Sequence, residues 1–317
     1  MKKRVFIAVL FLLFLLQAWA LTYAFSDTGK EPIEKTKTIL LYQLLYFQKL
    51  KKLEYAGKWT DIENGLKTFR KVHFVQSDEK YYRSVTNLDS AEKEKSLMIS
   101  AFDGDKYQFS QKLSPQDKGV LIFSSNLLPN DFTSSADIFF SLYGFALSWG
   151  EVATFSKLRE EKRWENLCGM VINYKEAPGK GVVITIKRPK EKVGEGDYTY
   201  YIERTFEILF ASDYGYFPLH IKSQLTATPA KEEKSPASIL TEEIRVTDIK
   251  RFDDIPFPLK LEIVSRGKEG KEIGKFSFTL SLDSLKINRE VDEKIFTIPR
   301  SGVGMIIDED TGEVLRQ

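Results

Sequence analysis

The sequence predicts an α+β protein built on an antiparallel sheet, and a repeated hairpin pattern is the main reason. An apolar stretch at Phe206–Phe210 is followed by a turn at Asp213–Tyr216 and by a strand that starts Phe-Pro-Leu at residue 217. The same order recurs forty residues later, where Ile244–Ile249 alternates and a strand starts Phe-Pro-Leu at residue 257. Proline is tolerated near the start of a strand because the missing N–H costs little there.

The first regular element expected is an amphipathic helix over Ile39–Leu53. Its apolar residues recur at helical spacing, and its lysines gather near the carboxy end, where the helix dipole favours cations. We expect this helix to lie across the sheet. The apolar positions are Leu41, Leu44, Leu45, Phe47, Leu50 and Leu53.

Strands are expected next, because aromatic and β-branched residues dominate Lys67–Val75 and Lys80–Val85. A hairpin follows, with strands at Ser96–Phe102 and Lys106–Gln111 around the turn Asp103–Asp105. The Asp-Gly pair in that turn accepts the positive φ angles of a tight reversal.

A second helix is expected within Asp131–Trp149, and it is apolar on nearly every side. Its only interior charge is Asp137. Such a helix is buried all round, plugs a cavity or faces lipid. If it plugs a cavity, its aromatic side chains act as a lipid gate; if it is a permanent core helix, they do not. The gate candidates are Phe139, Phe140, Tyr143 and Trp149.

The strand pattern then continues to the end of the chain. Strands are expected at Trp164–Tyr174, Gly181–Lys187, Tyr198–Phe210 and Lys275–Leu282. Because no long Pro-, Gly- or Ser-rich linker divides the chain, we expect one domain over residues 25–317.

The amino terminus has the pattern of a secretory signal peptide over residues 1–24. Three basic residues precede the apolar run Val5–Leu16, and a small-x-small site at Ala20 or Ala24 can be cleaved. An uncleaved anchor is the alternative. Removing the three basic residues leaves 44 basic against 45 acidic residues, a net charge of about −1. Because of the signal peptide, we expect a periplasmic or extracellular protein. Because the net charge is close to zero, we expect no positively charged surface that would bind nucleic acid.

The residue types that usually carry catalysis are scarce. The chain has two histidines, His73 and His220, both in expected strands, and one cysteine, Cys168, in an apolar stretch. No His or Cys spacing typical of zinc is present. The acidic run Asp308–Gly312 lacks the spacing of an EF-hand loop and is expected to be a turn. The sequence predicts neither an enzyme nor a cofactor or metal site.

The carboxy-terminal motifs, taken in order, resemble those of one known family. Leu285–Asn288, Ile295–Pro299, Gly302–Gly304 and Asp308–Gly312 follow the two hairpins in turn. This order resembles the outer-membrane lipoprotein carrier superfamily, the LolA-like lipoprotein-sorting group, over about residues 165–312. The turn at Asp254–Pro256 lacks that family's glycine, and Arg-Ser-Gly at residues 300–302 replaces its proline-rich end.

That resemblance implies a curved, half-barrel antiparallel sheet whose apolar concave face holds acyl chains, with helices covering that face. The abundance of 23 Phe, 14 Tyr and 4 Trp fits either such a face or an ordinary filled core. We therefore expect a carrier that binds a lipid or an acylated lipoprotein. The rival expectation is an envelope-sensing module that binds another protein through a strand edge. An apolar cavity favours the carrier, and a filled core with a bare edge favours the module.

Overall fold

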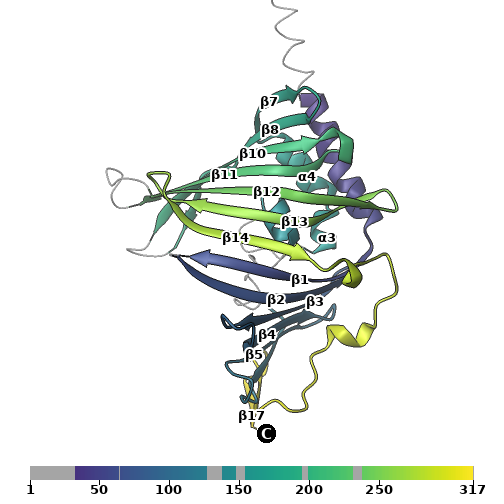
Figure 1. The fold of residues 1–317 in the computed structure, drawn as a ribbon, viewed down its shortest axis with the longest axis vertical. Helices are drawn as coiled ribbons and strands as arrows, with labels where there is room; N and C mark the ends of the chain where they lie inside the picture. Colours follow the sequence, from purple (N-terminus) through teal and green to yellow (C-terminus); the bar gives the residue numbers. More distant parts are fainter. Residues whose placement is uncertain are drawn as a thin grey trace, which may run out of the picture.

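The fold is described from a computed structural model, in residues 33–63, 65–126, 138–147, 154–194, 199–230 and 238–316 (Figure 1). The 17 strands of these residues belong to one sheet. The sheet is made of two meanders that meet at its middle, and helices cover part of one face. The fold class expected from the sequence, an α+β protein with an open antiparallel half-barrel, is confirmed.

The first meander runs from the middle of the sheet toward one edge. Each of its strands pairs antiparallel with the next. The strands are β1 (Lys52–Glu63), β2 (Leu66–Ser77), β3 (Lys80–Leu88), β4 (Glu94–Phe102), β5 (Tyr107–Lys112) and β6 (Val120–Ser124).

The second meander fills the other half of the sheet, which lies uppermost in Figure 1. β7 pairs with β8, and β10 pairs with β8, β9 and β11; from β11 to β14 each strand pairs with the next. The strands are β7 (Val171–Ala177), β8 (Gly181–Lys187), β9 (Glu191–Val193), β10 (Tyr200–Ala211), β11 (Phe217–Pro229), β12 (Ser238–Phe252), β13 (Ile255–Arg266) and β14 (Glu272–Leu280).

The two meanders join at β1, which pairs with β2 on one side and with β14 on the other. Gly57 makes this junction tight. A Cβ atom there would lie 2.3 Å from the ring of Phe278, so the ring packs where only glycine leaves room. β15 (Lys286–Ile287) extends the β14 side of the junction.

The sheet ends in a strand pair made by the carboxy-terminal tail. β16 (Met305–Asp308) pairs parallel with β6, and β17 (Glu313–Arg316) pairs antiparallel with β16. Among the described strands, β7 and β17 each have a single neighbour, so the sheet is open.

Both predicted Phe-Pro-Leu hairpins and the Asp-Gly hairpin are confirmed. Ile208 pairs with Ile221 across the β10–β11 hairpin, and Ile244 pairs with Ile263 across β12 and β13. In the third hairpin, the Asp103 carboxylate accepts the backbone N–H groups of residues 105 and 106, which closes the turn.

The predicted amino-terminal helix exists, but its bounds differ from the expected Ile39–Leu53. Among the described residues it covers 33–49, and β1 begins at Lys52. Leu53 continues the helical spacing, yet it also starts an alternating pattern with Tyr55 and Trp59, and all three are buried. Pairing with β2 therefore decides the conformation there.

Three short helices follow β6 in the chain. They are α2 (Ile138–Tyr143), α3 (Phe155–Leu158) and α4 (Glu161–Cys168). The expected strand at Trp164–Tyr174 is therefore wrong in its first part. Trp164 and Leu167 are buried at helical spacing in α4, and the strand begins at Val171. Among the described residues, no helix is both long and apolar enough to cross a bilayer.

Two hydrophobic cores lie on opposite faces of the sheet. The larger one includes the helices and reaches β4 through Met98. The smaller one includes Ala101 and packs against Ile99. Successive side chains of a strand point to opposite faces of the sheet. Met98 and Ile99 are adjacent in β4, so they face different cores. The tail covers the smaller core with Ile298 and Val303.

Candidate apolar binding cleft

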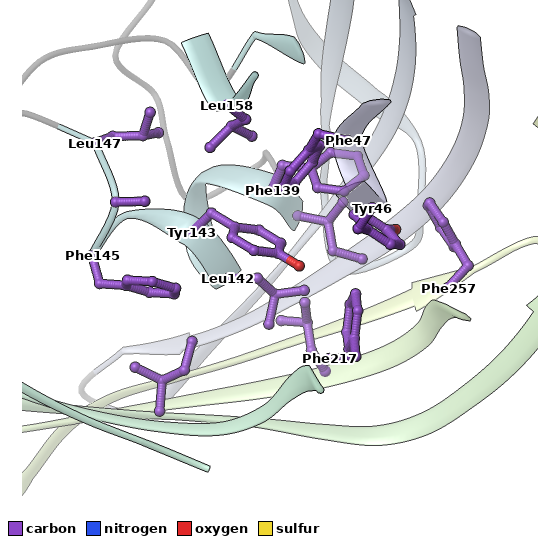
Figure 2. Close-up of a cluster of buried hydrophobic side chains, with 14 of the residues drawn as sticks. Tyr46, Phe47, Phe139, Leu142, Tyr143, Phe145, Leu147, Leu158, Phe217 and Phe257 are labelled. Carbon is purple, nitrogen blue, oxygen red and sulfur yellow. The ribbon is translucent and has the colours of Figure 1, made fainter. Parts of the chain in front are cut away.

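The concave face carries a tightly packed aromatic cluster where the helices meet the sheet (Figure 2). Phe47, in the amino-terminal helix, lies at its centre. Its ring centroid is 4.8 Å from that of Tyr143 and 5.8 Å from that of Phe139, both in α2. Phe139 in turn lies 6.0 Å from Phe257 of β13. All four side chains are fully buried, so this part of the concave face is filled.

Two hydrogen bonds cross the same cluster and fix its polar atoms. The Tyr143 hydroxyl donates to the Gln43 side-chain oxygen at 3.1 Å, and the Gln43 amide nitrogen donates to the Tyr216 carbonyl at 2.6 Å. Burial raises the pKa of Tyr143, so the hydroxyl stays protonated. These bonds connect α2, the amino-terminal helix and the β10–β11 turn.

Arginine side chains satisfy carbonyl groups at the carboxy ends of two helical segments. Arg159 donates to the carbonyls of Phe47, at 2.8 Å, and Leu50, at 2.9 Å. Beyond α2, Arg188 donates to the carbonyls of residues 145 and 147, and Arg163 donates to that of residue 146 at 3.2 Å. Such carbonyls have no partner within a helix, so these arginines fix both ends in place.

An apolar cleft of about 160 Å³ lies between the α2 segment and the sheet. Its floor is a row of side chains that the register places side by side. Ile221 pairs with Ile244, Ile244 with Ile263, and Ile263 with Phe276 across β11 to β14. Phe206 joins the floor, and the segment after β6 contributes the roof through Phe140, Ser141, Gly144 and Phe145.

One edge of the cleft is polar. Ser223 and Glu242 pair in the row next to the apolar one, and Arg204 lies beside them on β10. Burial lowers the pKa of Arg204, while Glu242 and Glu191 oppose that shift. The cleft therefore offers an apolar floor and a polar rim with both signs of charge.

The size of the cleft limits what it can hold in this conformation. Pockets for drug-sized ligands have volumes of roughly 300–1,000 Å³, and a cavity of about 150 Å³ holds one benzene molecule. At about 160 Å³, the cleft has room for part of an acyl chain. A whole acyl chain is larger than this cleft.

The four predicted gate residues have different surroundings. Phe139 and Tyr143 are fully buried in the aromatic cluster. Phe140 is partly exposed and lines the cleft. Trp149 lies outside the described residues. Composition identified the helix, but the expected body extended too far, because α2 ends at Tyr143 and residues 144–147 form a turn and a bend. It also could not show which face of the helix meets the cleft. The sequence did not identify the arginines that bind the helix-end carbonyls, because isolated arginines in a charged sequence form no recognisable pattern.

The histidines and the cysteine have ordinary structural surroundings. His73 lies 3.2 Å from Glu54, and His220 lies 2.8 Å from Glu243, which also binds Arg245 and Arg266. Cys168 is partly buried, and burial raises its pKa. Across the part of the chain that the structure describes, no three His, Cys, Asp or Glu side chains are grouped to hold a metal.

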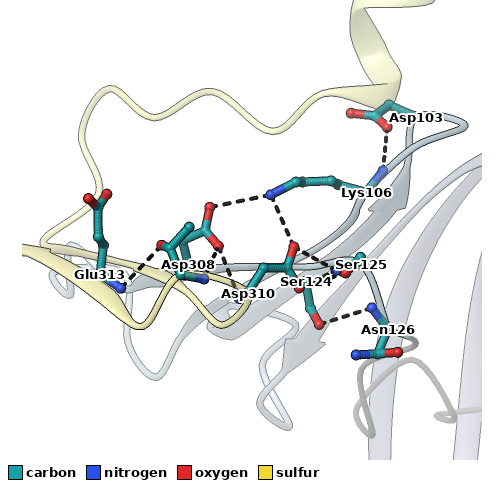
Figure 3. Close-up of polar contacts among 9 residues, drawn as sticks. Asp103, Lys106, Ser124, Ser125, Asn126, Asp308, Asp310 and Glu313 are labelled. Carbon is teal, nitrogen blue, oxygen red and sulfur yellow. Dashed lines mark hydrogen bonds and ion pairs between the residues drawn. The ribbon is translucent and has the colours of Figure 1, made fainter.

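The acidic run near the carboxy end forms a turn, as predicted (Figure 3). Asp308 accepts the backbone N–H groups of Asp310 and Thr311 at 3.1 and 3.2 Å. Lys106 lies 3.0 Å from Asp310 and 3.4 Å from Asp308. Asp310 also accepts the N–H and hydroxyl of Ser125, and the N–H bond lowers its pKa to about 2. The turn thus holds β16 beside β5 and β6.

Comparison with known proteins finds similarity in structure. No protein-family model matches the chain, and no curated protein matches its sequence. A DUF1329 family protein from Desulfovibrio piger is 9% identical, with a TM-score of 0.43 over 84% of this chain and 97% of that one. An outer membrane lipoprotein-sorting protein domain from Vibrio parahaemolyticus is 8% identical, with a TM-score of 0.39 over 84% and 97%.

A third solved structure is a LolA superfamily protein from Nitrosomonas europaea. It is 10% identical, with a TM-score of 0.38 over 83% of this chain and 97% of that one. The second and third proteins carry the names of the superfamily that the carboxy-terminal motifs resemble.

Proposed function

We propose that the protein is a carrier that binds an acyl chain of a lipid or a lipoprotein on its concave face, without covalent catalysis. The cleft between the α2 segment and the row Ile221, Ile244, Ile263 and Phe276 carries this proposal. Its apolar floor beside a polar rim suits an amphiphile, with the chain on the isoleucine row and the polar head at Arg204.

The energetics of burial are sufficient for such binding. Each methylene group removed from water contributes about 0.8 kcal/mol, so about six buried methylenes contribute roughly 5 kcal/mol. Further methylenes need further room. In this proposal the entering chain takes the place of Phe140, whose ring lines the cleft and is already partly exposed.

The first experiment replaces Phe140 with Asp and measures bound species by native mass spectrometry with lipid extraction. The protein is purified in its mature form from its own cells under mild conditions. We expect discrete lipid or acylated-protein adducts on the wild type and at least a tenfold loss in Phe140→Asp, because a carboxylate on the cleft is costly to cover with an acyl chain.

Two matched variants test whether the effect is local. Phe139→Asp places the same charge in the filled core and is expected to unfold the protein, whereas Phe140→Asp keeps its circular dichroism spectrum. Leu282→Asp changes a residue that is 48% exposed and is expected to leave lipid binding unchanged. If Phe140→Asp unfolds as Phe139→Asp does, α2 is a permanent core helix.

A second candidate function is binding of another protein by strand addition. β7 pairs only with β8 among the described strands, and Ile172 in β7 is 62% exposed. A protein that purifies without adducts and takes up no added lipid would favour this function over the carrier.

A further inference from the structure

A hollow of about 530 Å³ lies on the face of the sheet opposite the helices. It is lined by β14, β1, β2 and β3, which are neighbours in the sheet. In β1, Tyr55 and Trp59 belong to the helix-covered core, so Ala56 and Lys58 point to the other face. Both of these residues line the hollow, which is therefore separate from the cleft under α2.

The register places two rows of side chains across this hollow. Neighbouring strands lie about 4.8 Å apart, so a row over four strands spans about 14 Å, and the rows are about 7 Å apart. One row is Thr279, Lys58, Lys71 and Thr86. The other is Ser281, Ala56, His73 and Ser84.

The first row contains an unfavourable pair of charges. Lys58 and Lys71 are directly opposite each other on β1 and β2, and like charges in that position destabilise a sheet. Lys67 adds a further positive charge nearby, since it also lowers the pKa of Glu92. Both lysines line the hollow, and the Lys58 ammonium lies 4.4 Å from the ring centroid of Phe69. Two positive charges this close form a site that favours an anion.

The protein supplies one anion itself. Glu92, in the β3–β4 turn, lies 2.5 Å from the Lys58 ammonium and adopts a φ of 61°, which is uncommon for a non-glycine residue. The hydrogen bond to Lys58 lowers the pKa of Glu92, and the charges of Lys58, Lys71 and Lys67 add to the effect. Lys71 makes no ion pair with any residue that the structure describes. The single carboxylate of Glu92 therefore balances the positive charges of the two opposed lysines only in part.

We propose that this hollow binds a phosphoryl group between the ammonium groups of Lys58 and Lys71. A phosphoryl group carries up to two negative charges and three acceptor oxygens. Those features match two lysines better than a single carboxylate does. Glu92 competes with the ligand for Lys58. The group belongs either to a lipid headgroup or to a free phosphorylated molecule.

The experiment uses the full mature protein at low salt and two probes. Glycerol 3-phosphate is titrated calorimetrically, and vesicles of phosphatidic acid in phosphatidylcholine are tested by co-flotation against vesicles of phosphatidylcholine alone. Binding of the soluble probe identifies a free phosphorylated ligand. Binding of the anionic vesicles alone identifies a lipid headgroup. Either result supports the site if it depends on the lysines as follows.

Lys58→Gln and Lys71→Gln are each expected to weaken binding about tenfold, because each removes a charge-assisted hydrogen bond. Glu92→Gln is expected to strengthen it about threefold, because it removes the internal competitor. Lys268→Gln removes the same charge from an exposed turn and is expected to change nothing. All four side chains are at the surface or partly exposed, so the variants are expected to fold.

Two results would overturn the site. One is the absence of binding of either probe to both the wild type and Glu92→Gln. The other is an equal loss in Lys268→Gln and Lys58→Gln, which would assign the binding to overall charge. Phe140→Asp is expected to leave phosphoryl binding intact, so failure of this site and failure of the acyl-chain cleft are distinguishable.

Discussion

The two halves of the sheet are covered by different means and on different faces. Over the β10–β14 half, the cover is a helix layer held by packed rings and by side chains that clamp helix ends, and the cleft lies beneath it. Over the β4–β6 half, the cover is the carboxy-terminal tail, which is hydrogen-bonded to β5 and pairs with β6. Side-chain packing can be rearranged more easily than backbone hydrogen bonds, so the helix cover is the one that can move more readily.

The tail is attached through two polar side chains. Asn288 accepts the N–H of Lys51 at 2.7 Å and donates to the carbonyl of Lys49 at 2.8 Å, where the helix gives way to β1. Gln108, which is buried in β5, accepts the N–H of Ile298 at 2.8 Å. The tail motifs that carry the family resemblance therefore have a structural role in this protein.

The largest expected effect is on the helix layer. Phe47→Ala removes the central ring of the aromatic cluster and is expected to lower the free energy of unfolding by about 3–5 kcal/mol. Urea unfolding followed by circular dichroism measures it. Tyr42→Ala, on the same helix but 42% exposed, is the control and is expected to cost much less. Equal losses in the two variants would mean that the cluster does not hold the helix on the sheet.

An intermediate effect is expected on the tail. Asn288→Ala removes three side-chain hydrogen bonds and places alanine at a φ of 53°, so the free energy of unfolding is expected to fall by about 2–3 kcal/mol. Asn173→Ala, at an exposed position of β7, is the matched control. If limited proteolysis cuts the tail of both variants at the same rate, the hydrogen bonds of Asn288 do not hold the tail in place.

The smallest effect concerns the outer face of the helix-covered half. The hydrogen bond from Arg245, with those from His220 and Arg266, lowers the pKa of Glu243 from 4.5 to about 2. A lowered pKa in the folded state stabilises the protein above pH 4.5, and the contribution is lost as the pH falls toward 2. Because Arg245 is largely exposed, solvent screens this network, and we expect about 1–2 kcal/mol.

Glu243→Gln is expected to lack that contribution at neutral pH and to unfold with a weaker dependence on acid. Denaturant midpoints measured at pH 7, 4 and 2.5 test this. Glu269→Gln, in the exposed β13–β14 turn, should retain the wild-type dependence. A wild-type slope in Glu243→Gln would assign the acid sensitivity to other carboxylates.

The hairpins were predictable because their determinants are local. An alternating pattern, an Asp-Gly pair or a proline at a strand start depends on a few adjacent residues, and these predictions match the β4–β5, β10–β11 and β12–β13 hairpins. The start of β1 depends on pairing with β2 and with the distant β15, and the helical conformation of Trp164 depends on packing in the larger core. Local patterns therefore placed these residues in the wrong type of element.

The candidate cleft was only partly predictable, for the same reason. The apolar composition of residues 138–147 indicated a buried or cavity-plugging helix, but the face that meets the isoleucine row is fixed by the sheet. The lysine pair of the opposite face was invisible, since Lys58 and Lys71 become neighbours only through the register of β1 and β2. The signal peptide, residues 1–24, lies outside the described residues and stays a prediction.

The junction at β1 has a consequence for the order in which the chain is made. One edge of β1 can pair with β2 as soon as the next residues have been made. The other edge pairs with β14, where Trp59 lies opposite Phe278, about two hundred residues later in the chain. Pairing at such separation slows folding, and an unpaired central edge invites pairing with other chains. Until β14 is made, the unpaired edge of β1 can therefore pair with other chains. This edge becomes the centre of the sheet once β14 has paired with it.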